Sequence, residues 1–164
     1  MDVHVAAVCR SGYYQLRQLR PLTRCLTTAA AETVVHAFVA SRLDYYNTLL
    51  YGVSDRLMRR LQSVQNAAAR LVTGVPRCDH ITLILQQLHW LLVRQRVLFK
   101  IAVLVFQCLA GQAPSYLSHD CQPVSDSRPH RLRSSDSLTC VVRRAHNTYG
   151  DQCFAAAGLE LFAG

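Results

Sequence analysis

The sequence predicts an all-α protein: a helical bundle of about five helices, followed by an irregular C-terminal tail in which a short β-hairpin is one option. Apolar residues recur at steps of three and four from Val5 to Leu50, and again from Leu57 to Leu71. The composition, 51% apolar and 17% charged, lies in the range of globular chains. With 164 residues the chain is long enough for one compact core.

The first 52 residues predict two helices joined by a short turn. The first helix is expected over about residues 4–20, because Pro21 interrupts the apolar period. The second helix is expected to open after Thr28, a residue type favoured at helix N-caps, and to stop at Gly52. One side of it is apolar and carries Val35, Val39, Leu43, Tyr46 and Leu50.

Three further helices are predicted between residues 54 and 109. Ser54 is expected to cap a helix whose apolar residues are spaced four, three, four and three apart, which is typical of a helix packed lengthwise on another: Leu57, Leu61, Val64, Ala68 and Leu71. Gly74 and Pro76 end it. Asp79 is expected to cap a short helix through Leu88. The segment 91–109 predicts a long helix that is apolar almost all round and therefore central in the bundle.

The composition changes after Gly111, where prolines and a Ser/Asp/Arg-rich stretch follow. We therefore expect a helical body over residues 1–112 and an irregular appendage over residues 113–164.

The most apolar segment, residues 97–106, is interrupted by Lys100 and is shorter than the roughly 20 residues that cross a membrane. No membrane association is predicted.

No catalytic centre, metal site or cofactor site can be read from the residues. A two-metal polymerase or nuclease needs converging carboxylates, whereas the ten acidic residues here are scattered singly. Asp44 lies inside a predicted helix, where we expect it to be exposed or paired with another side chain. Cysteine and histidine come close only as Cys78-Asp79-His80 and His119-Asp120-Cys121, without zinc-site spacing. Glycine-rich phosphate-binding loops are missing too. The sequence therefore predicts a protein that is not an enzyme.

The seven cysteines are an odd number without close pairs, so they do not form the pattern of a disulfide framework. No positively charged segment precedes an apolar one at the N-terminus, so a signal peptide is not expected. We expect an intracellular protein, in the nucleus or in the cytoplasm.

The net charge of +8 favours an anionic partner. Seventeen of the eighteen basic residues are arginine, which suits bidentate phosphate contacts. The excess is concentrated in residues 1–24, with net charge +3, and residues 54–77, with net charge +4. An alternative is a GC-rich coding sequence that encodes arginine wherever the surface carries a cation.

Two helix faces are candidates for nucleic-acid binding. On the first helix, cations and aromatic residues share an arc of about 120° at ~100° per residue: Arg10, Tyr13, Tyr14, Arg17 and Arg20. On the third predicted helix, arginines are expected to share one flank beside the apolar seam: Arg56, Arg59, Arg60 and Arg70. Such faces suit a nucleic-acid backbone and unpaired bases. The alternative is a solvated helix face without a partner.

Several segments resemble, in order, the C-terminal part of LINE-type (non-LTR) retrotransposon reverse transcriptases. Residues 41–52 read SRLDYYNTLLYG and resemble the family's SRLDYCN-x-LLYG signature. Residues 61–71, 79–82 and 88–91 resemble its LQ-x-VQNAAARL, DHIT and LHWLP motifs. The similarity continues through residues 113–117 and 131–134 and covers about residues 3–154.

The resemblance implies the region after the polymerase palm, comparable to the thumb and connection, in which the catalytic aspartates are not expected. The chain would then be a non-catalytic reverse transcriptase fragment with residual, sequence-independent affinity for RNA or an RNA–DNA duplex. Tyr46 replaces the signature cysteine, Leu83 and Leu92 replace prolines, and the end of the chain differs. These departures suggest a decayed or truncated copy.

Other functions stay open. One is a domesticated helical module that binds RNA or a protein partner. Another is a piece of an enzyme that works only with a palm domain. A bundle without its palm is also expected to expose apolar surface and to self-associate.

Overall fold

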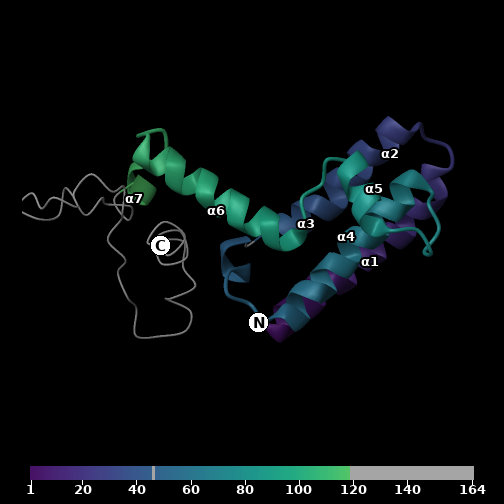
Figure 1. The fold of residues 1–164 in the computed structure, drawn as a ribbon, viewed down its shortest axis with the longest axis horizontal. Coiled ribbons are helices and arrows are strands. Elements are labelled where there is room, and N and C mark those ends of the chain that lie inside the picture. Colours follow the sequence, from purple (N-terminus) through teal and green to yellow (C-terminus); the bar gives the residue numbers. More distant parts are fainter. Residues whose placement is uncertain (46, 119–164) are drawn as a thin grey trace, which may run out of the picture. The chain divides into compact units, whose positions relative to one another are not determined.

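The computed structural model describes residues 1–45 and 47–118, and within this part every regular element is helical (Figure 1). This confirms the predicted fold class; the predicted hairpin lies outside the described residues. The elements are α1 (Asp2–Thr23), α2 (Thr28–Val35), the π-helical η1 (His36–Ala40), α3 (Ser41–Asp44), the 3₁₀-helical η2 (Asn47–Leu50), α4 (Asp55–Thr73), α5 (Ile81–Gln87), α6 (Val93–Leu109) and α7 (Ser115–Ser118).

The chain divides into two compact units. Of the described residues, the first unit, here called the main unit, contains 1–45 and 53–96, and the second contains 47–52 and 97–118. The division falls inside α6, whereas the boundary near residue 112 stays a prediction. None of the helices in the described residues is long and apolar enough to cross a membrane.

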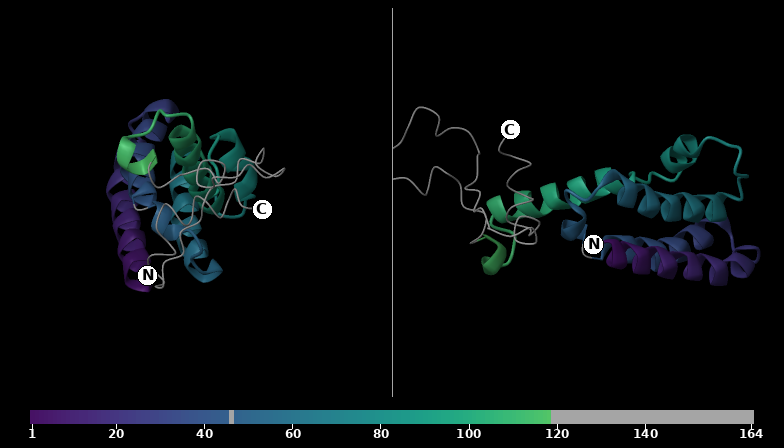
Figure 2. Two further views of the ribbon diagram at one scale, coloured as in Figure 1. Left: turned by 90° about the vertical axis from the view of Figure 1, so that its left-hand side faces the viewer. Right: turned by 90° about the horizontal axis from the view of Figure 1, so that it is seen from below.

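In the main unit, α1 and α4 run parallel and side by side (Figure 2). Near the start of both helices Asp2 Oδ1 lies 3.8 Å from Arg56 Nη2. Further along, Tyr13 Oη lies 2.9 Å from Ser63 Oγ. The two helices are in contact at Gly12, where a Cβ atom would lie 2.7 Å from Val64 Cγ1. A residue without a side chain is therefore required at this crossing.

The first helix continues past Pro21 and ends at Thr23, so the prediction that it ends at Arg20 is wrong. A proline inside a helix removes one backbone hydrogen bond and crowds the carbonyl four residues earlier, but Pro21 lies in the last turn, where little helix follows. The Thr23 hydroxyl donates to the Arg20 carbonyl at 3.0 Å and helps to close this turn.

The predicted second helix is divided into α2, η1 and α3. Thr27, not Thr28, is the N-cap, and its hydroxyl accepts from the Ala30 N–H at 3.3 Å. The helix ends at Asp44 because Tyr45 is extended, and Leu50 lies in the separate η2. The buried stripe explains the π-helical turn: Ala31, Val35, Val39 and Leu43 are spaced four apart. Four residues exceed the 3.6 of an α-helical turn, so one wider turn keeps the stripe facing inward.

The third predicted helix is confirmed as α4. It starts after Ser54, whose side chain makes no capping hydrogen bond, and stops at Gly74 in the left-handed region, φ 69°. The Gly74 N–H donates to the Arg70 carbonyl at 2.9 Å. The buried stripe is broader than the predicted seam, since Met58, Gln65 and Ala69 are also buried.

The short helix α5 begins after His80, so the prediction that Asp79 caps it is wrong. At its other end His89 has φ 54°; its N–H donates to the Gln86 carbonyl, and the Trp90 N–H donates to the Leu85 carbonyl at 2.8 Å. These two bonds form a Schellman motif, in which glycine usually occupies the left-handed position. Trp90 packs against the cluster that contains Leu85, so Leu88-His89-Trp90 is a helix stop.

Because His89 adopts a conformation that suits glycine better, we expect His89→Gly to raise the free energy of unfolding by about 1 kcal/mol. Urea denaturation followed by circular dichroism measures this difference. His89→Ala keeps a Cβ atom and is expected to give no gain. A gain of the same size in both variants would contradict the conformational explanation.

A polar cluster on α4 holds the segment that leads into α6. The buried Gln65 donates from Nε2 to the Leu91 carbonyl at 2.8 Å and accepts from Gln62 Nε2 at 2.9 Å. Gln62 Oε1 accepts from the Val93 N–H at 2.9 Å, at the first residue of α6. The prediction that the helix over residues 91–109 is central in the bundle is wrong, since Phe99 and Phe106 of α6 are exposed.

Candidate nucleic-acid interface

The five candidate residues of α1 all lie on its exposed side: Arg10, Tyr13, Tyr14, Arg17 and Arg20. Tyr13 and Tyr14 are 46% and 59% exposed, so their rings are accessible to a ligand. The opposite side of α1 packs into the main unit through Val5, Cys9 and Leu16. The helical period alone separates these two sides, as predicted.

The four candidate arginines of α4 lie within an arc of about 100° at ~100° per residue, but they have different neighbours. Arg56 lies beside α1, within 3.8 Å of Asp2, and Arg60 is close enough to Cys9 of α1 to affect its pKa. Arg59 lines a separate cavity with Met58, Leu92 and Arg94. Successive arginines at 59 and 60 differ by about 100° around the helix and so reach different neighbours.

Arg70 has a structural role. It is half-buried, and its Nη2 donates to the carbonyls of Arg77 and Asp79 at 3.5 and 3.3 Å. It thus holds the loop between α4 and α5 against the end of α4. Its half-buried side chain is less accessible to a phosphate than the exposed arginines of α1.

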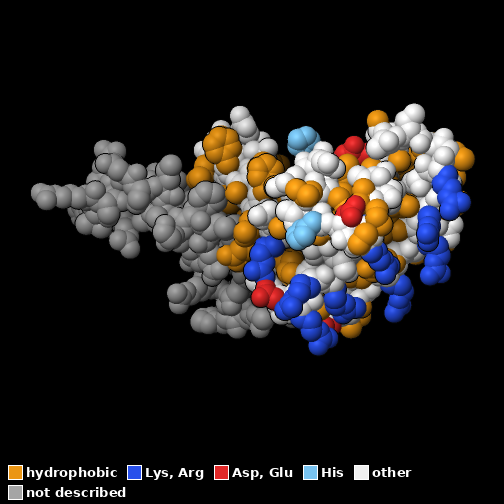
Figure 3. All heavy atoms as spheres, turned by 45° about the vertical axis from the view of Figure 1, so that its right-hand side comes forward, with side chains coloured by type: hydrophobic (Ala, Val, Ile, Leu, Met, Phe, Trp, Pro, Cys, Tyr) orange, Lys and Arg blue, Asp and Glu red, His pale blue; other side chains and the backbone are white. Residues whose placement is uncertain are grey.

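The remaining candidates form one surface, here called the basic face: Arg10, Tyr13, Tyr14, Arg17 and Arg20 of α1 with Arg56 and Arg60 of α4. Figure 3 shows Lys and Arg side chains gathered along this edge of the main unit and at its end. Within the described part of the chain, the acidic residue beside these arginines is Asp2, whose Oδ1 lies 3.8 Å from Arg56 Nη2 with both side chains exposed. The face therefore keeps most of its positive charge.

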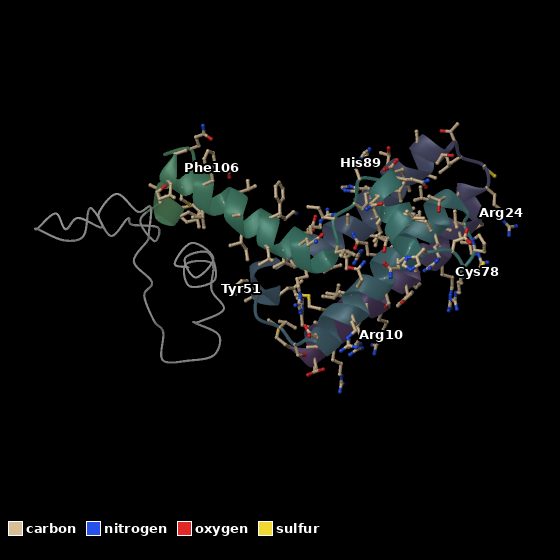
Figure 4. The ribbon with its side chains drawn as sticks, in the orientation of Figure 1. Arg10, Arg24, Tyr51, Cys78, His89 and Phe106 are labelled. Carbon is tan, nitrogen blue, oxygen red and sulfur yellow. The ribbon has the colours of Figure 1, made fainter. Side chains whose placement is uncertain are left out.

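Two arginines that sequence reasoning missed extend this charge. Arg24 is the exposed C-cap of α1, seven residues after Arg17 and thus on the same side of the helix. Arg77 is exposed in the loop after α4. Figure 4 places Arg24 and Cys78 at the same end of the unit, where α1 and α4 both finish, while Arg10 lies along the side. Ending the predicted helix at Arg20 concealed Arg24.

Cys9 lies beneath the basic face as part of the α1–α4 contact. Burial raises the pKa of its thiol, and the nearby Arg60 guanidinium offsets part of this rise. The thiol is therefore neutral at pH 7 and behaves as a small apolar side chain. It is not an activated nucleophile, because a reactive cysteine needs a lowered pKa.

Asp44 is paired with another side chain, which is one of the two alternatives predicted for it; the other was an exposed position. Its two carboxylate oxygens accept from Arg96 Nε and Nη2, each at 2.7 Å, and both side chains are 17% exposed. This bidentate pair joins α3 to the first turn of α6.

Among residues 1–45 and 47–118, no three His, Cys, Asp or Glu side chains come together as a metal site would require.

Comparisons of the chain with protein-family models, with curated proteins and with solved structures gave no match.

Proposed function

We propose that the main unit binds nucleic acid through its backbone, without sequence preference, and that the basic face is the contact surface. The observation that carries this proposal is the convergence of arginines from two parallel helices, with two exposed tyrosines on the same side of α1 as its arginines. Phosphate contacts supply most of the affinity in non-specific binding, and arginine makes them in bidentate fashion. Tyrosine rings add surfaces on which bases stack.

We further propose that the chain is a non-catalytic fragment of a LINE-type reverse transcriptase, comparable to its thumb and connection, and that its ligand is RNA or an RNA–DNA duplex. The sequence resemblance supports this. The structural roles of its motif residues agree with it: Asp44 pairs with Arg96, Gln65 holds Leu91, and Trp90 closes α5. These residues build a scaffold, which is what a duplex-holding region without polymerase aspartates requires. An intracellular location, nuclear or cytoplasmic, belongs to the same proposal.

Interaction with protein, including self-association, is the second candidate. Large apolar side chains are exposed in each unit: Leu83, Leu91 and Leu92 in the main unit, and Phe99 and Phe106 in the second. Exposed apolar area of this kind is typical of protein contact surfaces. A domesticated module could use it in place of nucleic acid or together with it.

The salt dependence of binding to duplex DNA tests the basic face. We expect Arg17→Gln with Arg60→Gln to lower the slope of log K against log salt by up to about 2, because each lost phosphate contact removes about 0.9. Fluorescence anisotropy with a labelled duplex at several salt concentrations gives the slope.

The matched control is Arg59→Gln with Arg94→Gln, which removes the same charge away from the face. We expect its slope to stay within about 0.5 of the wild type, since it removes no phosphate contact. Equal changes in both double variants would mean that net charge alone drives binding. The basic face would then lose its assignment.

A further inference from the structure

A groove of about 640 Å³ opens in the main unit between the first half of α1 and the η1–α3 segment. Its lining includes His4 and Ser11 of α1, Phe38 of η1, Arg42 of α3 and Tyr45. The volume lies within the range of small-molecule sites. The groove thus combines two aromatic rings with an arginine and a histidine.

The groove adjoins the basic face around the surface of α1. Ala7 lines the groove, and it lies one turn before Arg10 and two turns before Tyr14 along the same stripe of the helix. A strand that follows the arginines of α1 therefore passes the rim of the groove.

The π-helical turn presents Phe38 to this groove. Val39 and Ala40, the next two residues, are buried in the core, whereas Phe38 is 47% exposed and Tyr45 is 62% exposed. π-helical turns occur frequently at functional sites, since they change the direction of side chains locally. Phe38 thus lines the groove while Val39 and Ala40 stay in the core.

Arg42 is fixed at the groove by the opposite wall. Its Nη1 donates to Ser11 Oγ of α1 at 2.7 Å, which leaves its other N–H groups available. A guanidinium held beside aromatic rings binds the phosphate next to a stacked base, and it also offers hydrogen bonds to base edges. An uncharged apolar ligand would make no use of it.

We infer that this groove binds one unpaired base of a nucleic-acid strand, stacked on Phe38 or Tyr45, with its phosphate held by Arg42. The inference rests on the proposed function, because the basic face brings the strand to the groove. A paired base cannot enter, since its faces are covered by its neighbours in the duplex. The groove therefore gives the protein a preference for single strands or for duplexes with an unpaired end.

The test uses the full chain and a single-stranded oligonucleotide with one 2-aminopurine, whose fluorescence falls on stacking. A hairpin of the same sequence carries that base in the paired state. We expect Phe38→Ala with Tyr45→Ala to weaken single-strand binding about tenfold or more and to abolish the quenching, in keeping with the loss of one stacking platform. Affinity for the hairpin stem stays unchanged.

Tyr116→Ala is the control, because Tyr116 is an exposed aromatic ring that lies outside the groove, at 70% exposure. It is expected to change neither affinity. The groove assignment is wrong if the wild type binds the single strand and the hairpin without quenching of the 2-aminopurine fluorescence. It is also wrong if the double variant keeps wild-type affinity for both probes. In either case the basic face stands. If the wild type binds neither probe, the proposed function fails and the groove assignment fails with it.

Discussion

Arg96→Gln is expected to lower the free energy of unfolding by about 2–3 kcal/mol. Arg96 holds both oxygens of Asp44 at 2.7 Å, and each side chain is only 17% exposed. Removal of one partner leaves the other charge largely buried without its counter-ion. This loss of stability is smaller than for a fully buried pair, because water still reaches the two side chains. Urea denaturation of the full chain measures the loss.

Arg94→Gln is the control for this experiment. Arg94 lies two residues earlier on the same helix and pairs with Asp55, but both side chains are well exposed. Exposed ion pairs contribute about 0–1 kcal/mol to stability, so we expect a small change in the free energy of unfolding. Replacement of both Asp44 and Arg96 by apolar residues is expected to recover most of the stability lost in Arg96→Gln. Equal losses in Arg96→Gln and Arg94→Gln would contradict the role given to the buried pair.

The second large effect is expected at the α1–α4 crossing, where Gly12→Leu lowers the free energy of unfolding by about 3 kcal/mol. A Cβ atom alone would lie 2.7 Å from Val64 Cγ1, and a branched valine has little freedom to move away. A leucine must therefore push the two helices apart. Thermal or urea unfolding measures the loss. Gln18→Leu, at an exposed position of the same helix, is expected to be nearly neutral.

The smaller variant Gly12→Ala tests whether this contact is the cause. In the wild type the clash outweighs the gain of up to about 1 kcal/mol that alanine brings to a helix interior, so stability falls. In a Val64→Ala background the space is free, and the same substitution is expected to raise stability. A fall of the same size in both backgrounds would show that Val64 is not the atom group in conflict.

Both effects bear on function, because the basic face exists only while α1 and α4 lie side by side. Arg10, Arg17 and Arg20 belong to one helix, and Arg56 and Arg60 to the other. A variant that separates the helices is therefore expected to lose nucleic-acid affinity in proportion to its unfolded fraction.

Much of the fold follows from the helical period. The stripe through Leu57, Leu61 and Val64 indicated α4, and Gly74 indicated its end. On α1 the same period placed the arginines and tyrosines on the exposed side. These features depend on neighbours along the chain, which the sequence contains. Two predictions about helix ends were wrong, the end of α1 before Pro21 and the capping of α5 by Asp79. Both concern neighbours along the chain, where more than one residue near a helix end can occupy the cap.

The sequence alone predicts the helical class, the apolar stripes and the exposed residues of each helix. The tertiary structure was needed to show which arginines share a surface: Arg60 lies beside α1, Arg59 faces the segment that leads into α6, and Arg70 holds a loop. It also decided that Gly12 meets Val64, that Asp44 pairs with Arg96, and that η1 presents Phe38 to a groove. These contacts join residues about 30 to 50 positions apart, and neither partner's local sequence specifies the other.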